Sequence, residues 1–228
     1  MGETIEFTAA DGRTVGGYLA RGPEGSPGVV VIQEWWGVNA QIEGVCDRLS
    51  DAGFNALAPD LYNGTVVPLE EPDGAAKEMM SLQLAHAGAD LSGAVDVLAT
   101  LSGREAVGVL GFCMGGGLAL VLGDLRPDAI KAVVPCYGVH PWPEAHPSYE
   151  SYSAATQIHC AAKDGFFTPE AAQALRDKLL SRGLEVDLLV YPDSDHAFFN
   201  EDRADVYNAA DAALLWERTV TFLASHLG

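Results

Sequence analysis

The chain has 228 residues and a formal net charge of -19, because 32 acidic residues stand against only 13 Lys and Arg. This length suffices for one α/β domain with a substantial core, so we expect a single domain over residues 1–228. The acidic balance leaves no basic cluster to neutralise phosphates, so nucleic acid and anionic membrane surfaces are not expected partners.

The use of cysteine and the apolar runs bear on compartment and cofactors. The four cysteines, Cys46, Cys113, Cys136 and Cys160, show no C-x-x-C spacing. No N-terminal stretch resembles a signal peptide, and no apolar run could cross a bilayer, so we expect a reducing cytoplasm. His159 and Cys160 are neighbours in a predicted strand and must point to opposite faces. We therefore interpret the cysteines other than Cys113 as core residues and expect neither a metal nor a cofactor.

The hydrophobic pattern alternates between strands and helices. Segments 4–7 and 14–19 around a turn at Asp11-Gly12 predict an antiparallel hairpin. An apolar run at 28–32 is typical of a strand buried on both faces, and a helix is predicted at 40–52. Further strands are predicted at 55–58, 106–110, 132–135, 157–162 and 186–191, with helices at 75–101, 114–122, 169–182 and 205–227. Gly88 and Gly93 could interrupt the helix at 75–101. The alternation predicts a mostly parallel doubly wound sheet with helices on both faces and no cap domain.

A cysteine lies between two glycines in the turn Gly111-Phe112-Cys113-Met114-Gly115. This G-x-Nuc-x-G pattern, between an apolar strand and a helix, is typical of a nucleophile elbow, which places its central side chain at the top of a sheet. An ordinary thiol has a pKa of about 8.5 and is partly ionised near neutrality, so cysteine suits nucleophilic attack. The alternative is a small buried cysteine in a glycine-rich turn.

An acid and a histidine follow this cysteine in the order that an α/β-hydrolase triad requires. Asp164 comes directly after the predicted strand 157–162, and His196 lies in the loop after the last strand. His196 could accept the thiol proton while Asp164 orients its ring. Alternatively, His196 is an exposed loop residue and Asp164 a turn or capping residue. Asp193 and Asp195 compete for the acid role.

The loop after strand 28–32 reads Gln33-Glu34-Trp35-Trp36-Gly37. In this fold the second oxyanion donor lies there, so the backbone N–H groups of Trp35 and Met114 are the expected oxyanion hole. A carboxylate at the end of a buried strand must be paired or functional, which makes Glu34 a candidate site residue. Otherwise Glu34 caps the next helix or bonds a neighbouring backbone group.

These motifs together resemble the dienelactone hydrolase family of the α/β-hydrolase fold. The likeness covers most of the chain: Q-E-W-W-G-V-N at 33–39, A-P-D-L-Y at 58–62, G-F-C-M-G-G at 111–116, Y-G at 137–138, Asp164 and H-A-F at 196–198. It implies a cofactor-independent hydrolase of lactones or activated esters with Cys113 as nucleophile, His196 as base and Asp164 as its orienter. By the same resemblance, Glu34 would contact the resting thiol and accept its proton. The candidate substrate-binding residues are Trp36, Tyr137, Phe166 and Phe198.

The chain also departs from this family. Family members that hydrolyse dienelactone hold its carboxylate with arginines, one before the long helix and one shortly after the catalytic histidine. Here residues 69–102 contain Lys77 but no Arg, the residue four after His196 is Asn200, and Arg203 follows three further on. Because only arginine grips a carboxylate bidentately, we expect neutral lactones or short aryl esters to be better substrates than dienelactone. The loop 138–153, with Trp142, could cover a larger or more apolar group.

Two other functions fit the same residues. One is a broad carboxylesterase or thioesterase with the same triad. The other is a non-catalytic small-molecule receptor, because a fold does not fix an activity. The expected partner is a small ester or lactone, and the expected assembly is a monomer or a small homo-oligomer.

Overall fold

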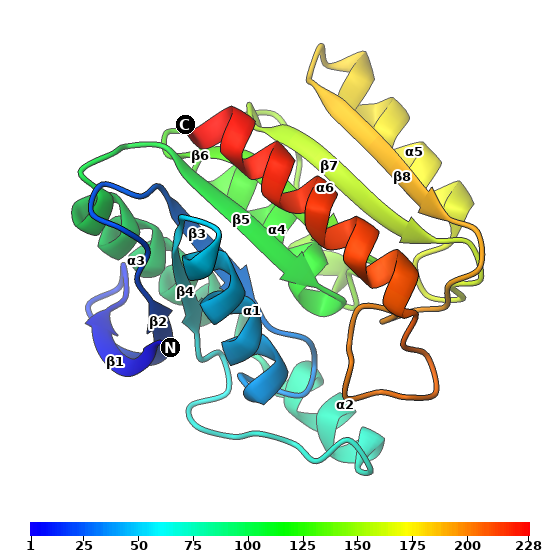
Figure 1. The fold of residues 1–228 in the computed structure, drawn as a ribbon, viewed down its shortest axis with the longest axis horizontal. Coiled ribbons are helices and arrows are strands. Elements are labelled where there is room, and N and C mark those ends of the chain that lie inside the picture. Colours follow the sequence, from blue (N-terminus) through cyan, green and yellow to red (C-terminus); the bar gives the residue numbers. More distant parts are fainter.

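The computed structural model describes all residues from 1 to 228 and contains one eight-stranded sheet (Figure 1). The strands lie in the order β1-β2-β4-β3-β5-β6-β7-β8, with β1 and β2 antiparallel and the strands from β3 to β8 parallel to one another. Their bounds are β1 (Glu3–Thr8), β2 (Thr14–Ala20), β3 (Gly28–Ile32), β4 (Asn55–Pro59), β5 (Val107–Phe112), β6 (Ile130–Cys136), β7 (Ala155–Ala161) and β8 (Val186–Tyr191). The predicted hairpin and parallel sheet are confirmed.

Helices cover both faces of this sheet and divide the core in two. The helices are α1 (Ala40–Asp51), α2 (Pro72–Ser81), α3 (Leu84–Ser102), α4 (Met114–Leu125), α5 (Pro169–Ser181) and α6 (Ala209–Leu227), with a short 3₁₀ turn, η1 (Pro143–Ala145). Figure 1 shows α1 and α6 on one face, and α3, α4 and α5 on the other. The buried apolar side chains accordingly form two large clusters, one on each side of the sheet. None of the helices combines the length and the apolar character that a bilayer crossing needs.

The central strands hold the site in place because they are buried on both faces. All residues of β3 and β5 are buried, as their continuous apolar runs predict. At Gly108 of β5, a Cβ atom would lie 2.8 Å from the side chain of Leu227 and 2.9 Å from that of Leu223. This glycine therefore lets α6 approach the sheet closely.

The segment predicted as one helix at 75–101 forms two. The break falls at Leu82 and Gln83 rather than at Gly88 or Gly93. Leu82 has an extended backbone (φ -60°, ψ 124°), and its side chain packs against the core. The prediction was wrong because a tertiary contact ends the helix. The last helix begins at Ala209, four residues after its predicted start.

The aromatic residues of the loop 138–153 belong to the core. Trp142, Tyr149 and Tyr152 are 3%, 4% and 5% exposed, and they pack into the cluster that includes α3 and α4. A Cβ atom on Gly123 of α4 would lie 2.5 Å from the Tyr152 ring. The Tyr152 ring therefore packs against α4, and all three aromatic side chains belong to the core and do not cover a substrate.

Candidate active site

A cavity of about 480 Å³ opens at the carboxyl ends of the parallel strands. Its lining residues follow five different strands, namely β3, β5, β6, β7 and β8, with Met79 added from α2. They are Glu34, Trp35, Trp36, Met79, Cys113, Val139, His140, Pro141, Phe166, His196, Ala197 and Arg203. The predicted nucleophile, base and thiol-activating residue thus share one cavity, at the position where this sheet topology places ligands.

Cys113 occupies the sharp turn between β5 and α4. Its backbone has φ 54° and ψ -121°, a conformation that residues with a side chain rarely adopt. The neighbouring glycines are required sterically. A Cβ atom on Gly111 would lie 2.0 Å from the Gly115 carbonyl oxygen, and one on Gly115 would lie 2.5 Å from the Gln33 carbonyl oxygen. The turn therefore presents the Cys113 side chain, 9% exposed, to the cavity.

Half-buried His196 and fully buried Asp164 form a pair after the ends of β8 and β7. Nδ1 of His196 lies 2.7 Å from Oδ2 of Asp164. Oδ1 of Asp164 accepts the backbone N–H groups of Phe166 at 2.7 Å and Phe167 at 3.0 Å. Asp164 therefore stabilises its own turn and also binds the histidine, so the two roles that the sequence analysis gave as alternatives occur together.

The charge state of His196 follows from its neighbours. Burial by itself lowers the pKa of His196, but hydrogen bonds to Asp164 and to the Cys113 side chain outweigh it and raise that pKa to about 10. Nδ1 of His196 is bound to Asp164, so Nε2 is the ring nitrogen left for Cys113, which lines the same cavity. Asp193 and Asp195 are exposed and make no hydrogen bond to His196.

Glu34 lines the cavity but is buried, with 2% of its surface exposed. Its Oε1 accepts the hydroxyl of Tyr137 at 3.1 Å, and its Oε2 accepts the side-chain amide of Asn200 at 2.8 Å. Burial raises the pKa of Glu34, and the hydrogen bond from Asn200 opposes that shift. The N-cap of α1 is Asn39, so the Glu34 side chain does not cap that helix.

The side chain of Glu34 is not hydrogen-bonded to the Cys113 thiol. Its two oxygens have other partners, both of them side chains distant in sequence. The contact with the resting thiol that the resemblance implies would require the carboxylate to leave one or both of these partners.

Trp35, which follows β3, and Met114, which begins α4, are the expected oxyanion donors. The backbone N–H groups of Trp35 and Met114 have no acceptor among the hydrogen bonds of turns, loops and caps. Met114 is the first residue of α4, where an N–H group has no partner within the helix. Both donors are therefore available.

Two of the four candidate substrate-binding residues lie elsewhere than expected. Trp36 and Phe166 line the cavity, and the Phe166 ring is 78% exposed, with its centroid 5.1 Å from that of His196. Tyr137 and Phe198 are fully buried. Tyr137, at φ 39°, turns inward beneath His196 to reach Glu34, while Phe198 packs against Tyr137 and Tyr191. Both side chains are packed inside the protein, and neither lines the cavity.

The structure adds wall residues that the sequence did not identify. Met79 comes from α2, and Val139, His140 and Pro141 come from the start of the loop after β6. The ring of His140 lies 4.9 Å from that of His146. No group of three or more His, Cys, Asp or Glu side chains is placed to hold a metal ion.

Arg203 also reaches this wall, and its charge is already paired. One of its terminal nitrogens lies 2.5 Å from Oδ2 of Asp205. Asp202 and Glu70 lie with them around an adjoining depression. The single arginine of the cavity is therefore surrounded by carboxylates.

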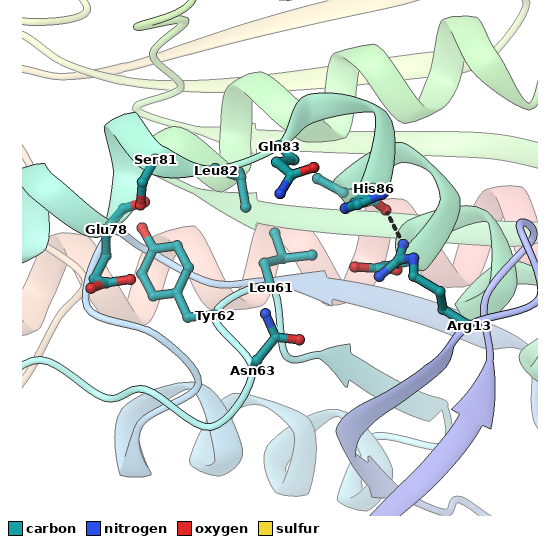
Figure 2. A pocket seen from close by; sticks show the side chains of 11 residues that line it. Arg13, Leu61, Tyr62, Asn63, Glu78, Ser81, Leu82, Gln83 and His86 are labelled. Carbon is teal, nitrogen blue, oxygen red and sulfur yellow. Dashed lines mark hydrogen bonds and ion pairs between the residues drawn. The ribbon is translucent and has the colours of Figure 1, made fainter.

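A second, smaller cavity of about 120 Å³ lies where the break between α2 and α3 faces the loop after β4 (Figure 2). Its arginine, Arg13, is bound to Asp90 at 2.6 Å and to the His86 carbonyl at 3.2 Å. Tyr62 links this cavity to the elbow, because its hydroxyl donates to Sδ of Met114 at 3.4 Å. The cavity is thus connected to the start of α4 only through Tyr62, and no residue of the triad lines it.

The sheet order and the strand-end site define an α/β-hydrolase. A profile of the Dienelactone hydrolase family matches residues 15–227, and the chain belongs to this family. Its family makes it a carboxylic-ester hydrolase, and a small ester or lactone substrate fits this family.

Two relatives match it over their whole length. "Protein usf" of Aquifex pyrophilus is 35% identical over 235 residues, and "Putative carboxymethylenebutenolidase" of Aquifex aeolicus is 31% identical over 235 residues, each alignment covering 100% of both chains. Among solved structures, "Putative Dienelactone Hydrolase" of Klebsiella pneumoniae superposes with a TM-score of 0.84 at 26% identity, covering 98% of this chain and 99% of that one.

Proposed function

We propose that this enzyme cleaves a lactone or an activated carboxylic ester through an acyl-enzyme intermediate on Cys113. The observation that carries the proposal is the alignment of three groups from three strand ends. His196 shares the cavity with the elbow cysteine, and its Nδ1 lies 2.7 Å from the Asp164 carboxylate, which leaves Nε2 for the thiol. This is the arrangement that nucleophilic acyl transfer requires.

The chemical steps follow from the positions of these atoms. Sγ of Cys113 attacks the acyl carbon, and its proton resides on Nε2 of His196. The carbonyl oxygen becomes negative and accepts the N–H groups of Trp35 and Met114. As the carbon–oxygen bond breaks, His196 returns its proton to the leaving alkoxide. Water then attacks the thioester, His196 accepts the water proton, and the carboxylic acid leaves as the thiol is restored.

The cavity wall favours a neutral substrate over one that carries a carboxylate. Trp36, Met79 and Phe166 supply apolar surface, and the only arginine, Arg203, is bound to Asp205. A carboxylate would have to compete with Asp205 for that guanidinium and would lie near Glu34. We therefore propose neutral lactones or short aryl esters as substrates.

The same triad would also serve a carboxylesterase or thioesterase of broader range, which differs only in the groups accepted on either side of the acyl carbon. The exposed Phe166 at the cavity mouth supports this breadth, since the entrance is open. A receptor without activity would not need a histidine paired to both a thiol and a carboxylate.

The test combines trapping with a substrate panel. Intact-mass spectrometry after rapid acid quench of a slow aryl ester should show an adduct of the acyl mass on wild type and none on Cys113→Ala. Cys113→Ala should fold normally and lose turnover, and Cys113→Ser should also be poor because a hydroxyl is far less acidic. Turnover by Cys113→Ala within tenfold of wild type would refute the nucleophile. Lactones and aryl esters, each with and without a free carboxylate, then rank the substrates.

A further inference from the structure

Gln33 lies directly after β3 and is fully buried, and it does not line the catalytic cavity. A buried amide needs hydrogen-bond partners, and the Gln33 side chain has one at each end. Its Oε1 accepts the backbone N–H of Leu61 at 3.2 Å, and its Nε2 donates to the carbonyl oxygen of Glu34 at 3.4 Å. Because only the oxygen can accept the Leu61 N–H, the NH₂ group must be the end that faces Glu34.

The carbonyl of Glu34 belongs to the same peptide group as the N–H of Trp35. A trans peptide group is planar, so its carbonyl and its N–H point in opposite directions. A contact that holds the carbonyl oxygen therefore also sets the direction of the Trp35 N–H, which is an expected oxyanion donor. A donor on the carbonyl also polarises the peptide group, which strengthens the hydrogen bond that its N–H can make.

A backbone turn holds the same carbonyl oxygen. The N–H of Gly37 donates to it at 3.4 Å and closes a turn over residues 34–37. A Cβ atom on Gly37 would lie 2.5 Å from the Thr65 carbonyl oxygen, so this turn packs against the loop after β4. A carbonyl oxygen has two lone pairs and can accept both donors. Substitution of Gln33 can therefore remove one donor and leave the backbone turn in place.

The segment that binds Gln33 also contacts the other oxyanion donor. Leu61 and Tyr62 follow each other in the loop after β4 (Figure 2). The hydroxyl of Tyr62 donates to Sδ of Met114 at 3.4 Å, and Oδ1 of Asp60 accepts the backbone N–H of Tyr62 at 2.9 Å. The amide of Gln33 thus ties the end of β3 to a segment that is itself bonded to the first residue of α4.

We propose that Gln33 is a positioning residue that directs the Trp35 N–H towards the substrate oxygen that becomes negative during acyl transfer. Gln33 does not touch the substrate and acts through the peptide group between Glu34 and Trp35. This inference rests on the proposed acyl-enzyme reaction and adds to it a residue outside the cavity. It also gives a reason for a polar, fully buried side chain directly after an apolar strand.

The substitution Gln33→Met tests this role, because it keeps an unbranched side chain of similar length and removes both hydrogen bonds. Loss of one oxyanion donor lowers kcat by about a hundredfold to a thousandfold, and Gln33 only orients such a donor, so kcat for a neutral aryl ester should fall by about tenfold to a hundredfold. KM should stay within about threefold of the wild-type value, since the side chain does not reach the cavity.

An inhibitor provides a readout that does not depend on the fraction of active enzyme. In a trifluoromethyl ketone that carries the acyl group of the ester, Sγ of Cys113 bonds to the carbonyl carbon, the oxygen becomes negative, and the thiol proton moves to Nε2 of His196. That oxygen occupies the oxyanion position, so the inhibition constant should rise in Gln33→Met by about the factor by which kcat/KM falls. The matching carbinol forms no adduct, and its inhibition constant should stay within about threefold.

The matched control is Gln157→Met. Gln157 is another buried glutamine, its Oε1 lies 3.1 Å from Nε2 of His159, and it does not line the cavity. In this control kcat/KM and both inhibition constants should stay within about threefold of wild type. If Gln33→Met does not fold, Gln33→Asn replaces it, because an amide one methylene shorter cannot reach Leu61 and Glu34 together.

Three outcomes overturn the inference: wild-type kcat and ketone inhibition in the Gln33 variant, equally weakened binding of ketone and carbinol, or the same losses in Gln157→Met. The first would show that the backbone turn alone orients the Trp35 N–H. The absence of an acyl adduct on Cys113 in the wild type would instead refute the proposed function. An intact adduct together with wild-type values in the Gln33 variant would refute only the role of Gln33.

Discussion

Replacing Asp164 by Asn should disable the base while leaving its surroundings in place. In the wild type, Oδ1 of Asp164 accepts two backbone N–H groups, from Phe166 and Phe167, and Oδ2 binds Nδ1 of His196. Only the oxygen of an amide can accept, so the Asn oxygen must stay with the two backbone groups. Its NH₂ group then takes the place of Oδ2 and faces Nδ1.

A donor facing Nδ1 selects the wrong form of the imidazole. Nδ1 must then be the unprotonated nitrogen, and the ring proton moves to Nε2, the atom that should accept the thiol proton. We expect kcat to fall by about a thousandfold to ten-thousandfold, or about 4 to 5.5 kcal/mol of transition-state stabilisation. KM should stay within about threefold, because the side chain of Asp164 is fully buried and does not line the cavity.

Steady-state kinetics with a neutral aryl ester at pH 7 measures both constants, and a thermal melt verifies folding. Asp195→Asn is the matched control, since it removes the same charge from an exposed position beside His196. A kcat of Asp164→Asn within tenfold of wild type would refute the orienting role of Asp164. A large loss in Asp195→Asn would move that role to Asp195.

Three further predictions concern packing, pH and charge. Gly117→Ala should lower the free energy of unfolding, measured in urea, by about 2 to 4 kcal/mol, because its Cβ would lie 2.0 Å from the Val139 carbonyl oxygen. In the control Gly44→Ala, the new Cβ lies in open space within α1, and the free energy of unfolding should rise by about 0.5 to 1 kcal/mol. Burial, then the charge of Arg218, lowers the pKa of His159 to about 3. Between pH 6.5 and 3, His159 therefore binds a proton in the unfolded chain but not in the folded one. The free energy of unfolding should fall in this range by at most about 1.4 kcal/mol for each unit of pH, and the slope should be shallower in His159→Gln. Arg203→Ala should leave the preference for neutral substrates, measured as a ratio of kcat/KM values, unchanged. A fall in kcat/KM confined to carboxylate-bearing substrates would show that Arg203 binds the substrate carboxylate and would contradict this prediction.

The parts of the site that follow local rules could be predicted from the sequence. The elbow around Cys113 has its own glycine pattern, and Asp164 and His196 follow apolar strands, so their common edge follows from parallel topology. Side-chain contacts between distant segments could not be predicted. The hydrogen bond from Asn200 to Glu34 joins positions 166 residues apart, and no periodicity carries that information.

Aromatic residues show the same limit. Phe166 and Tyr137 both follow a strand near the triad, yet one is exposed at the cavity mouth and the other is fully buried. The difference lies in contacts with distant segments, because Tyr137 bonds Glu34 and packs on Phe198, whereas Phe166 contacts the half-buried ring of His196. The break between α2 and α3 likewise depends on where Leu82 finds core to pack against.

The backbone at the elbow implies a conflict between stability and catalysis. At φ 54° the position of Cys113 suits glycine better than any residue with a Cβ atom, and a side chain there costs about 1 to 3 kcal/mol of strain. Selection for folding alone would therefore replace the nucleophile with glycine. An inactive Cys113→Gly protein should melt at a higher temperature than Cys113→Ala, even though glycine leaves the unfolded chain more conformational freedom. That difference would measure the folding stability that the enzyme gives up in order to present a reactive sulfur.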